Sequence, residues 1–245
     1  MIEQRRLLVS GVHGLGLKIG KKELSKLDLY TQTLLEWSNR INLTGHRDQE
    51  RIEIFHYLDS LSLFETGEIH PGLSAFRGLN QLQYLIHLFE TGEIHPGLSV
   101  LDVGSGAGFP GLPLRIFEPA LEMTLLESSG KKGFFLRYLV RILELPDVKI
   151  EIAQAKDFTR ETEASFDRIV CRAVGSLFKV CSWTVSLLKP GGLFLFQKSR
   201  KVDTEIQENK NALQRLGLTV REAIPLSVPY LDRPRYAVII EKIKK

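Results

Sequence analysis

The chain has 245 residues, of which 43% are hydrophobic and 25% are charged. These proportions are typical of a globular protein and exclude the fibrous, disordered and membrane-embedded classes. The 33 Lys and Arg residues exceed the 29 Asp and Glu residues by four, which permits a nucleic-acid partner without requiring one.

The sequence contains two cysteines, Cys171 and Cys181, with no CxxC pair and no histidine at ligand spacing. A disulfide framework and a structural zinc site are therefore not indicated, and we expect a reducing, cytoplasmic location with no bound metal. The arginine pair Arg5-Arg6 precedes apolar residues as in an export signal, but no small-residue cleavage site follows it. No apolar run approaches the roughly 18 residues that a membrane span needs.

The first elements in chain order are helical. Apolar side chains recur at spacings of three, four and seven between Leu24 and Leu43, which predicts amphipathic helices over residues 21–42. We assign residues 1–62 to a helical N-terminal lobe.

A string of twelve residues, LFETGEIHPGLS, occurs at 63–74 and again at 88–99. A solenoid needs about three or more repeats to bury a continuous core, so two copies indicate a single tandem duplication. We treat residues 63–99 as a duplicated segment in which about 25 residues are surplus to the fold, because long surface insertions cost little closure entropy.

The stretch before each copy has helical spacing, over residues 55–65 and 79–90. One hypothesis is that the two helices compete for one groove, so that the second displaces the first or leaves it exposed. The alternative is a surface insertion that packs nowhere.

From residue 98 onward, short apolar runs alternate with helical stretches, which predicts a doubly wound, largely parallel α/β sheet over residues 98–245. Seven strands are expected, and the last two are joined by a loop containing proline, which favours an antiparallel pair. The expected strands are 98–103, 122–126, 148–153, 166–171, 192–197, 218–224 and 236–241. The expected helices are 112–117, 131–143, 177–188 and 203–216.

A glycine-rich segment, DVGSGAGFPG, follows the first expected strand at 102–111. Glycines allow a sharp turn and close approach of a ligand to the backbone, and ligands of open α/β sheets bind at this edge. A dinucleotide fingerprint starting at Gly104 would need glycine at position 109, which is Phe109; one starting at Gly106 begins two residues late. The residues fit the pattern D-x-G-x-G-x-G instead.

That pattern resembles motif I of the class I S-adenosylmethionine-dependent methyltransferases. S-adenosylmethionine carries a sulfonium and an amino group and has no pyrophosphate, so an acidic residue such as Asp102 can lie beside it at the strand end. In the alternative interpretation, the Asp102 carboxylate caps nearby backbone amides. Glu127 ends the second strand, 23 residues after Gly104, near the spacing at which an acid reaches ribose hydroxyls. Ala155 and Lys156, after the third strand, are expected beside the adenine edge.

Several other chemistries are excluded by missing motifs. The Asp/Asn-Pro-Pro-aromatic motif of adenine amino-group methylation is absent, and Cys171 lacks the Pro-Cys setting of cytosine C5 enzymes. Gly130-Lys131-Lys132 lacks the upstream glycine and the following Ser or Thr of a P-loop, so ATP hydrolysis is not expected.

A narrower resemblance covers residues 24–63 and 98–243. The chain resembles the GidB/RsmG family of bacterial small-subunit ribosomal RNA methyltransferases; the motifs that carry the resemblance are Trp37, Asn42-Leu43-Thr44, His56, Leu58-Asp59-Ser60, residues 101–111, Glu127-Ser128, Gly130-Lys131-Lys132 and Arg172-Ala173. The resemblance implies a class I Rossmann-like fold and methylation of N7 of a guanosine in 16S RNA. It also implies a cofactor site, to which we assign Asp102, Gly104, Gly106, Gly108, Phe109, Glu127, Ser128, Ser129, Ala155, Lys156 and Arg172.

The implied acceptor explains why the sequence shows no acid/base dyad. Guanine N7 has a free lone pair and no proton, so the enzyme has chiefly to align donor and acceptor. Arg172, at a strand end, is the candidate catalytic residue for holding the cofactor or the base; a surface salt bridge is its alternative. The expected phosphate contacts are Lys131, Lys132, Lys198 and Arg235.

We expect a monomer that acts on the small ribosomal subunit or its 16S RNA. Two alternatives remain open at this point: a methyltransferase with another acceptor, and an RNA-binding module that the duplication has inactivated. Trp37 and Tyr30 are candidates for stacking on bases, but their helical spacing is also that of core residues.

Overall fold

A computed structural model describes residues 5–69, 97–158, 164–199 and 202–244. Within these ranges the strands are β1 (Ser99–Val103), β2 (Glu122–Glu127), β3 (Lys149–Ile152), β4 (Phe166–Arg172), β5 (Leu188–Lys198), β6 (Leu218–Leu226) and β7 (Arg235–Lys242). The α-helices are α1 (Arg6–Gly14), α2 (Lys21–Ser38), α3 (Gln49–Ile52), α4 (Asp59–Leu61), α6 (Gly111–Phe117), α7 (Gly130–Ile142), α8 (Leu177–Thr184) and α9 (Val202–Arg215). The described ranges also contain a π-helical segment, η2 (Glu53–Leu58), and two 3₁₀ segments, η3 (Ser62–Thr66) and η5 (Val185–Leu187).

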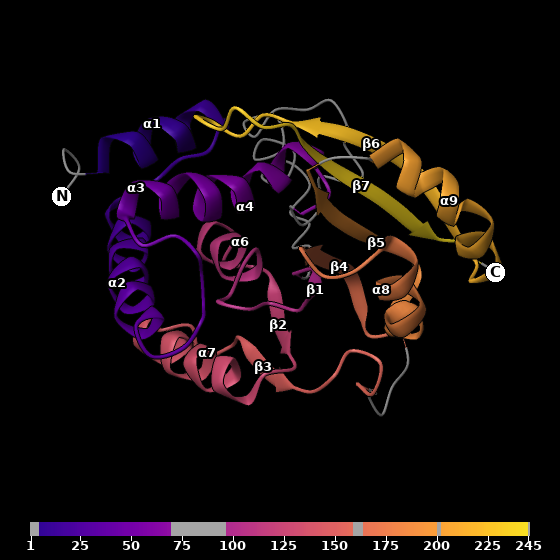
Figure 1. Cartoon of the computed structure of the whole chain (residues 1–245), viewed down its shortest axis with the longest axis horizontal. Coiled ribbons are helices and arrows are strands. Elements are labelled where there is room, and N and C mark those ends of the chain that lie inside the picture. The colour runs from indigo at the N-terminus through magenta and orange to yellow at the C-terminus, as the bar shows by residue number, and fades with distance from the viewer. Residues whose placement is uncertain (1–4, 70–96, 159–163, 200–201, 245) are drawn as a thin grey trace, which may run out of the picture.

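The described strands form one seven-stranded sheet in the order β3-β2-β1-β4-β5-β7-β6 (Figure 1). The strands from β1 to β5 pair in parallel, while β7 runs antiparallel to both β5 and β6. The predicted doubly wound α/β fold with an antiparallel closing pair is therefore confirmed. Because the order reverses between β1 and β4, the carboxyl ends of these two strands flank the position where such sheets bind ligands.

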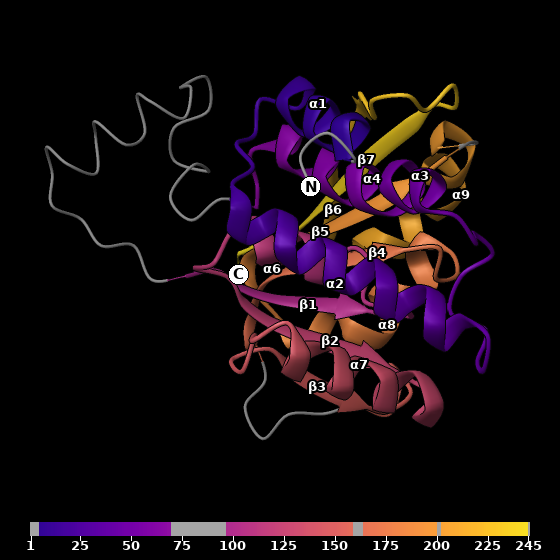
Figure 2. The same ribbon diagram turned by 90° about the vertical axis from the view of Figure 1, so that its left-hand side faces the viewer.

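Helices cover both faces of the sheet, as the two views show (Figures 1 and 2). Alternate residues of the strands enter different cores, since side chains of a strand point to opposite faces. Val100 of β1 packs in a cluster with α1, α2, α6 and α7, whereas its neighbour Leu101 packs in a second cluster with α8 and α9. The N-terminal helices thus share the core of the sheet.

Helix α1 was not among the predicted elements. Its buried side chains are Leu8 and Val12, and Arg5 just before it forms ion pairs with Asp28 and Glu53. The sequence signal for this helix was weak because two glycines and a histidine interrupt its apolar pattern. Burial of Leu8 and Val12 in the core stabilises the helix despite its low intrinsic propensity. Among the described residues no helix is long and apolar enough to cross a membrane.

The other corrections concern element ends. Helix α2 ends at Ser38 rather than at residue 42, and α8 ends at Thr184 before the 3₁₀ turn η5. Strand β5 begins at Leu188, four residues before the prediction, although Gly191 has a positive φ of 78° and the pairing with β4 is irregular there. Of this added stretch only Leu188 pairs with β4, opposite Phe166, and the pairing resumes at Leu193.

The first copy of the duplicated string begins inside the fold. Its residues Leu63, Glu68 and Ile69 are buried, and Arg168 of β4 donates to the main-chain oxygen of Glu68 at 2.7 Å. The preceding helical stretch, which includes the fully buried Leu58, packs in the core. The first helical stretch, at 55–65, is therefore neither displaced nor exposed, and that hypothesis is wrong. Residues 70–96 lie outside the described residues; they include the helical stretch expected at 79–90 and positions 88–96 of the second copy.

The adjacent phenylalanines of α7 provide a test of this packing. Phe135 is fully buried, whereas 64% of the Phe134 side chain is exposed. We predict that Phe135→Ala lowers the free energy of unfolding by about 3–5 kcal/mol, because it removes a ring from the core. The matched variant Phe134→Ala should change it by about 0.5 kcal/mol or less. Urea denaturation measures both, and equal losses in the two variants would contradict the assignment of faces.

Candidate active site at the glycine turn

The turn between β1 and α6 is built from glycines with left-handed backbone conformations. Gly104, Gly106 and Gly108 have φ values of 70°, 60° and 101°, which residues with a Cβ rarely adopt. A Cβ on Gly104 would lie 2.3 Å from the side chain of Val174, whereas one on Gly106 would meet nothing closer than 3.9 Å. The backbone at Gly106 is therefore accessible, and the turn can form one wall of a ligand site.

Glu127, at the end of β2, holds this turn from the side. Its Oε2 accepts a hydrogen bond from the N–H of Gly106 at 2.8 Å, and its Oε1 accepts one from the N–H of Ser129 at 2.8 Å. Ser129 also caps α7, since its hydroxyl accepts from the N–H of Lys132. The structure thus brings Glu127 beside the glycines, as its spacing from Gly104 predicted, together with Ser128 and Ser129, which the resemblance had assigned to the site.

Asp102 lies beneath the turn and is fully buried. Its Oδ2 accepts from the N–H of Gly111 at 3.0 Å, so the side chain caps the start of α6. Its Oδ1 is buried without a hydrogen-bond partner among the described residues. Burial raises the pKa of Asp102 to about 7. Of the two readings of Asp102 from the sequence, the cap on an amide is observed, and its use toward a ligand stays a prediction.

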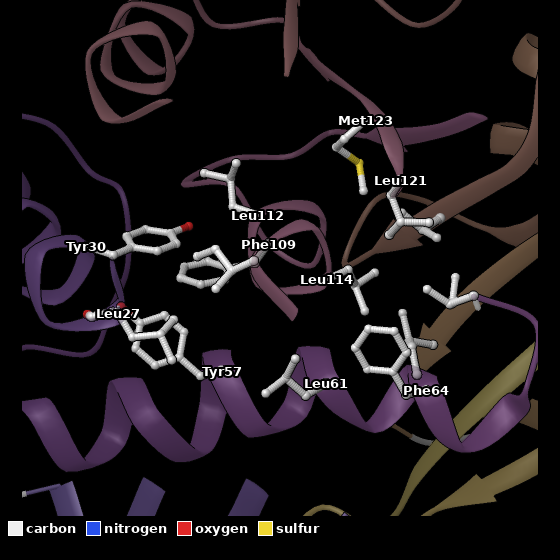
Figure 3. Packing of buried hydrophobic residues seen from close by; sticks show 14 of the residues in the cluster. Leu27, Tyr30, Tyr57, Leu61, Phe64, Phe109, Leu112, Leu114, Leu121 and Met123 are labelled. Atoms are coloured by element: carbon white, nitrogen blue, oxygen red, sulfur yellow. Dashed lines mark hydrogen bonds between the residues drawn. The ribbon is translucent and has the colours of Figure 1, made fainter. Parts of the chain in front are cut away.

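Three stacked rings attach the N-terminal helices to the turn. The Phe109 ring lies between Tyr30 of α2 and His56 of η2, with centroids 5.2 and 4.5 Å away and planes within 13° of parallel. Tyr30 donates a hydrogen bond to the carbonyl of Ala107 at 2.6 Å, and Figure 3 shows its ring beside Phe109. Tyr30 is fully buried and so is a core residue, which excludes it from stacking on bases.

His56 is held as a neutral ring. Its Nδ1 is 3.1 Å from a guanidinium nitrogen of Arg172, and its Nε2 is 2.7 Å from the hydroxyl of Thr44. Because arginine only donates, Nδ1 accepts and Nε2 carries the proton that it donates to Thr44. Burial, and next the charge of Arg172, lower the pKa of His56 to about 2. His56 therefore positions its neighbours and does not act as a general base at neutral pH.

A buried carboxylate, Asp59, pairs with two arginines that lie far apart in the sequence. Arg172 at the end of β4 donates to Asp59 Oδ2 at 3.0 Å, and Arg235 at the start of β7 donates to Oδ1 at 2.8 Å. The Arg172 guanidinium also lies 5.3 Å from the centre of the Phe109 ring. Asp59 contributed to the family resemblance, but nothing in the sequence indicated this pairing.

These residues line a cleft of about 610 Å³ between the helical segment and the ends of β4 and β5. Its lining residues are His46, Arg51, Phe55, His56, Asp59, Arg172, Ala173, Gln197, Lys198, Ser199, Arg233 and Arg235. Five of them are Lys or Arg and one is acidic, so the cleft favours an anionic ligand. Arg172 connects the cleft to the glycine turn through Phe109.

The remaining predicted residues are more dispersed. Ala155 and Lys156 follow β3, whose end is tied to the site by the hydrogen bond from the N–H of Ala153 to the carbonyl of Glu127. Lys198 lines the cleft and pairs with Glu205 at 3.0 Å. Lys131 and Lys132 lie in the first turn of α7, outside the cleft lining.

Neither cysteine has the environment of a nucleophile. Cys171 and Cys181 are both buried, and burial raises the pKa of the Cys171 thiol to about 12. No group of three or more His, Cys, Asp or Glu side chains that could hold a metal ion occurs among the described residues.

The strand order, the glycine turn and the acid at the end of β2 define a class I methyltransferase fold of the Rossmann-like type. Two solved structures share the fold: a candidate transferase of Pyrococcus horikoshii (TM-score 0.51, 13% identity, 70% of this chain and 67% of that one) and a candidate methyltransferase of Thermoplasma acidophilum (TM-score 0.50, 15% identity, 64% and 74%).

The GidB family model, described as rRNA small subunit methyltransferase G, matches residues 79–233. The Ribosomal RNA small subunit methyltransferase G of Alkaliphilus metalliredigens is 33% identical over 246 residues, covering 100% of this chain and 92% of that protein. The protein of the same name from Lachnoclostridium phytofermentans is 31% identical, covering 97% and 88%. The chain therefore belongs to the GidB family, rRNA small subunit methyltransferase G.

The raised pKa of Asp102 predicts a pH-dependent stability. The folded protein retains a proton on Asp102 up to about pH 7, whereas the unfolded chain releases it near the ordinary value of 3.8, so this contribution to stability is lost as the pH rises between them. We predict that Asp102→Asn gains stability relative to the parent over this interval, by up to about 1.4 kcal/mol per pH unit. Urea denaturation at several pH values measures the difference, and a difference independent of pH would contradict the burial argument.

The pairing of Asp59 predicts a large effect of a conservative change. Asp59→Asn leaves two arginines without their carboxylate in a buried setting, and we expect a loss of about 3–5 kcal/mol in the free energy of unfolding. Glu36→Gln is the matched control, since Glu36 pairs with Arg40 at 4.0 Å on the surface, where such pairs contribute about 1 kcal/mol or less. A loss below about 1 kcal/mol for Asp59→Asn would show that the pair is solvated.

Proposed function

We propose that the chain transfers a methyl group from S-adenosylmethionine to N7 of a guanosine in the 16S RNA of the small ribosomal subunit. The observation that carries the proposal is the open glycine turn beside Glu127 in a chain of this family. The names of the relatives support ribosomal RNA of the small subunit as substrate.

The residues present fit this cofactor. The backbone at Gly106 leaves room for a ligand, and each oxygen of Glu127 can accept from a ribose hydroxyl alongside its present amide partner, because a carboxylate oxygen has two lone pairs. The unpartnered Oδ1 of Asp102 suits a positively charged amino group. Ala155 and Lys156, beyond β3, are on the side where we place the adenine. When bound, the cofactor supplies an electrophilic methyl group on a positively charged sulfur.

The chemistry of the cleft agrees with an acceptor that needs no general base. Guanine N7 attacks with a free lone pair, so the protein contributes alignment and electrostatics. His56 is neutral and already donates and accepts through its two nitrogens, and neither cysteine is ionised. Arg172 lies between the turn and the cleft, where we assign it to hold the cofactor or the base.

Lys198 and Arg235 lie at the cleft as two of its cations, and we assign them to phosphates of the RNA. We also retain the division of the chain into helical residues 1–62, the duplicated segment 63–99 and a cofactor-binding unit at 98–245 as part of the proposal.

The direct test uses small ribosomal subunits that lack the modification, incubated with the protein and labelled cofactor. We expect the label in 7-methylguanosine after nuclease digestion of the 16S RNA. Label in another nucleotide or in protein would redirect the acceptor. If the protein binds the RNA without transfer and a variant lacking residues 75–99 restores transfer, the duplication inactivates an otherwise competent enzyme.

A variant of Glu127 tests the cofactor site itself. We predict that Glu127→Gln weakens S-adenosylmethionine binding by about 10- to 150-fold, because hydrogen bonds to a charged group contribute about 1.5–3 kcal/mol. Glu122→Gln, at the opposite end of the same strand, should bind as the parent does. Isothermal titration calorimetry measures both, and equal affinities for the two variants would place the cofactor elsewhere.

A further inference from the structure

Three aromatic side chains form a patch on the surface where α2 meets α7. Trp37 of α2 lies 6.0 Å from Phe134 and 5.4 Å from Tyr138 of α7, between ring centres. Trp37 also packs edge-on against the buried Phe135, which anchors it to the core. The exposed fractions of Phe134 and Tyr138 are 64% and 38%, and an exposed cluster of rings on a folded domain marks a binding surface more often than a lone ring does. We call Trp37, Phe134 and Tyr138 the aromatic patch.

Exposed cations continue the patch along α7. Lys131 precedes Phe134 by three residues and Arg141 follows Tyr138 by three, so all four share one face of the helix, and Arg137 lies beside them. Within the part of the chain that the structure describes, Lys131, Arg137 and Arg141 form no ion pair. These three cations can therefore bind an anion without sharing it with a carboxylate partner, whereas Lys198 and Arg235 also hold Glu205 and Asp59.

The patch flanks the proposed cofactor site. Helix α7 begins directly after Ser129, and Phe134 lies about 6 Å along the helix axis from its first residue, Gly130. The segment that follows Trp37 contains Thr44, which is hydrogen-bonded to His56, and His46, which lines the cleft. His46 comes nine positions after Trp37 in the sequence, so the patch and the cleft are at most about 30 Å apart.

We propose that the aromatic patch stacks an unpaired base of the substrate RNA while Lys131, Arg137 and Arg141 neutralise phosphates of the same strand. The inference rests on the proposed function and adds a second contact to it, outside the cleft. Flat exposed rings beside free cations match single-stranded nucleic acid, in which every nucleotide has a planar base and a negative charge. A second copy of the chain would instead bring two sets of these cations together, which disfavours self-association through this face.

The test compares RNA binding by the double variant Phe134→Ala and Tyr138→Ala with that of the parent. We use a labelled single-stranded 12-nucleotide RNA and a 12-base-pair RNA duplex as probes. Because stacking contributes a factor of about 5–150 per base, we expect the single-strand affinity to fall by such a factor and the duplex affinity to remain unchanged. Restoring rings with Phe134→Trp and Tyr138→Trp should restore binding.

Phe178→Ala is the matched control, since Phe178 on α8 is 37% exposed and lies on the opposite face of the sheet. It should leave both affinities unchanged. Replacing Arg137 and Arg141 by Gln should instead lower the slope of log affinity against log salt by about 1.4 for the single strand. The aromatic variants should leave this slope unaltered, because they remove no charge.

Equal single-strand affinity for the parent and the double alanine variant overturns the inference, as does an equal loss for strand and duplex. A parent that is dimeric in sedimentation, with a monomeric alanine variant, also overturns it, because the patch is then a self-association surface.

The proposed function fails separately: in that case the parent itself transfers no methyl group to small subunits, whatever the variants bind. With transfer intact, the variant should raise KM for the subunit and leave kcat within about twofold.

Discussion

The turn after β1 is the constraint on which the rest of the site depends, and two carboxylates hold it. Asp102 binds the start of α6 from below, and Glu127 binds Gly106 and the start of α7 from the side. A turn with three left-handed glycines has a high conformational entropy when free, so it needs such fixed acceptors to keep one shape. The same acids are the groups that a cofactor with ribose hydroxyls and an amino group can use.

The aromatic stack transmits the position of this turn to the N-terminal helices. Phe109 is part of the turn, and its two stacking partners come from different helical segments, so the helices and the sheet share one structural unit around it. His56 then meets Arg172, and Arg172 meets Asp59, which also binds Arg235. A chain of direct contacts therefore runs from the glycine turn to the far side of the cleft. Displacement of any one member therefore moves its direct neighbours, among them Arg172, which we assign to the cofactor or the base.

The sequence was informative where the physical signal is local. Short apolar runs between helical stretches located all seven strands of the sheet. The spacing from Gly104 to Glu127 correctly predicted that Glu127 lies beside the glycine turn. The pairing of Asp59 with Arg172 and Arg235 could not be predicted, because more than 100 residues separate the partners and only the folded topology brings them together. The aromatic patch could not be predicted for the same reason. Trp37 has the spacing of a core residue, and it meets the exposed Phe134 and Tyr138 only because α2 packs against α7 in the folded chain.

The early boundary of β5 and the unforeseen helix α1 show the other limit of local reasoning. In each case residues with weak or opposing propensity adopt regular structure because a neighbour supplies hydrogen bonds or apolar contacts: β4 for the start of β5, and the core beside Leu58 for α1.

The central claim is that the glycine turn and Glu127 hold an adenosyl sulfur donor and not a dinucleotide. Calorimetric titration of the purified chain with S-adenosylhomocysteine, and separately with NADH, tests it most directly. The account predicts saturable heat with one molecule of S-adenosylhomocysteine per chain and none with NADH. Binding of NADH together with no response to S-adenosylhomocysteine would contradict it.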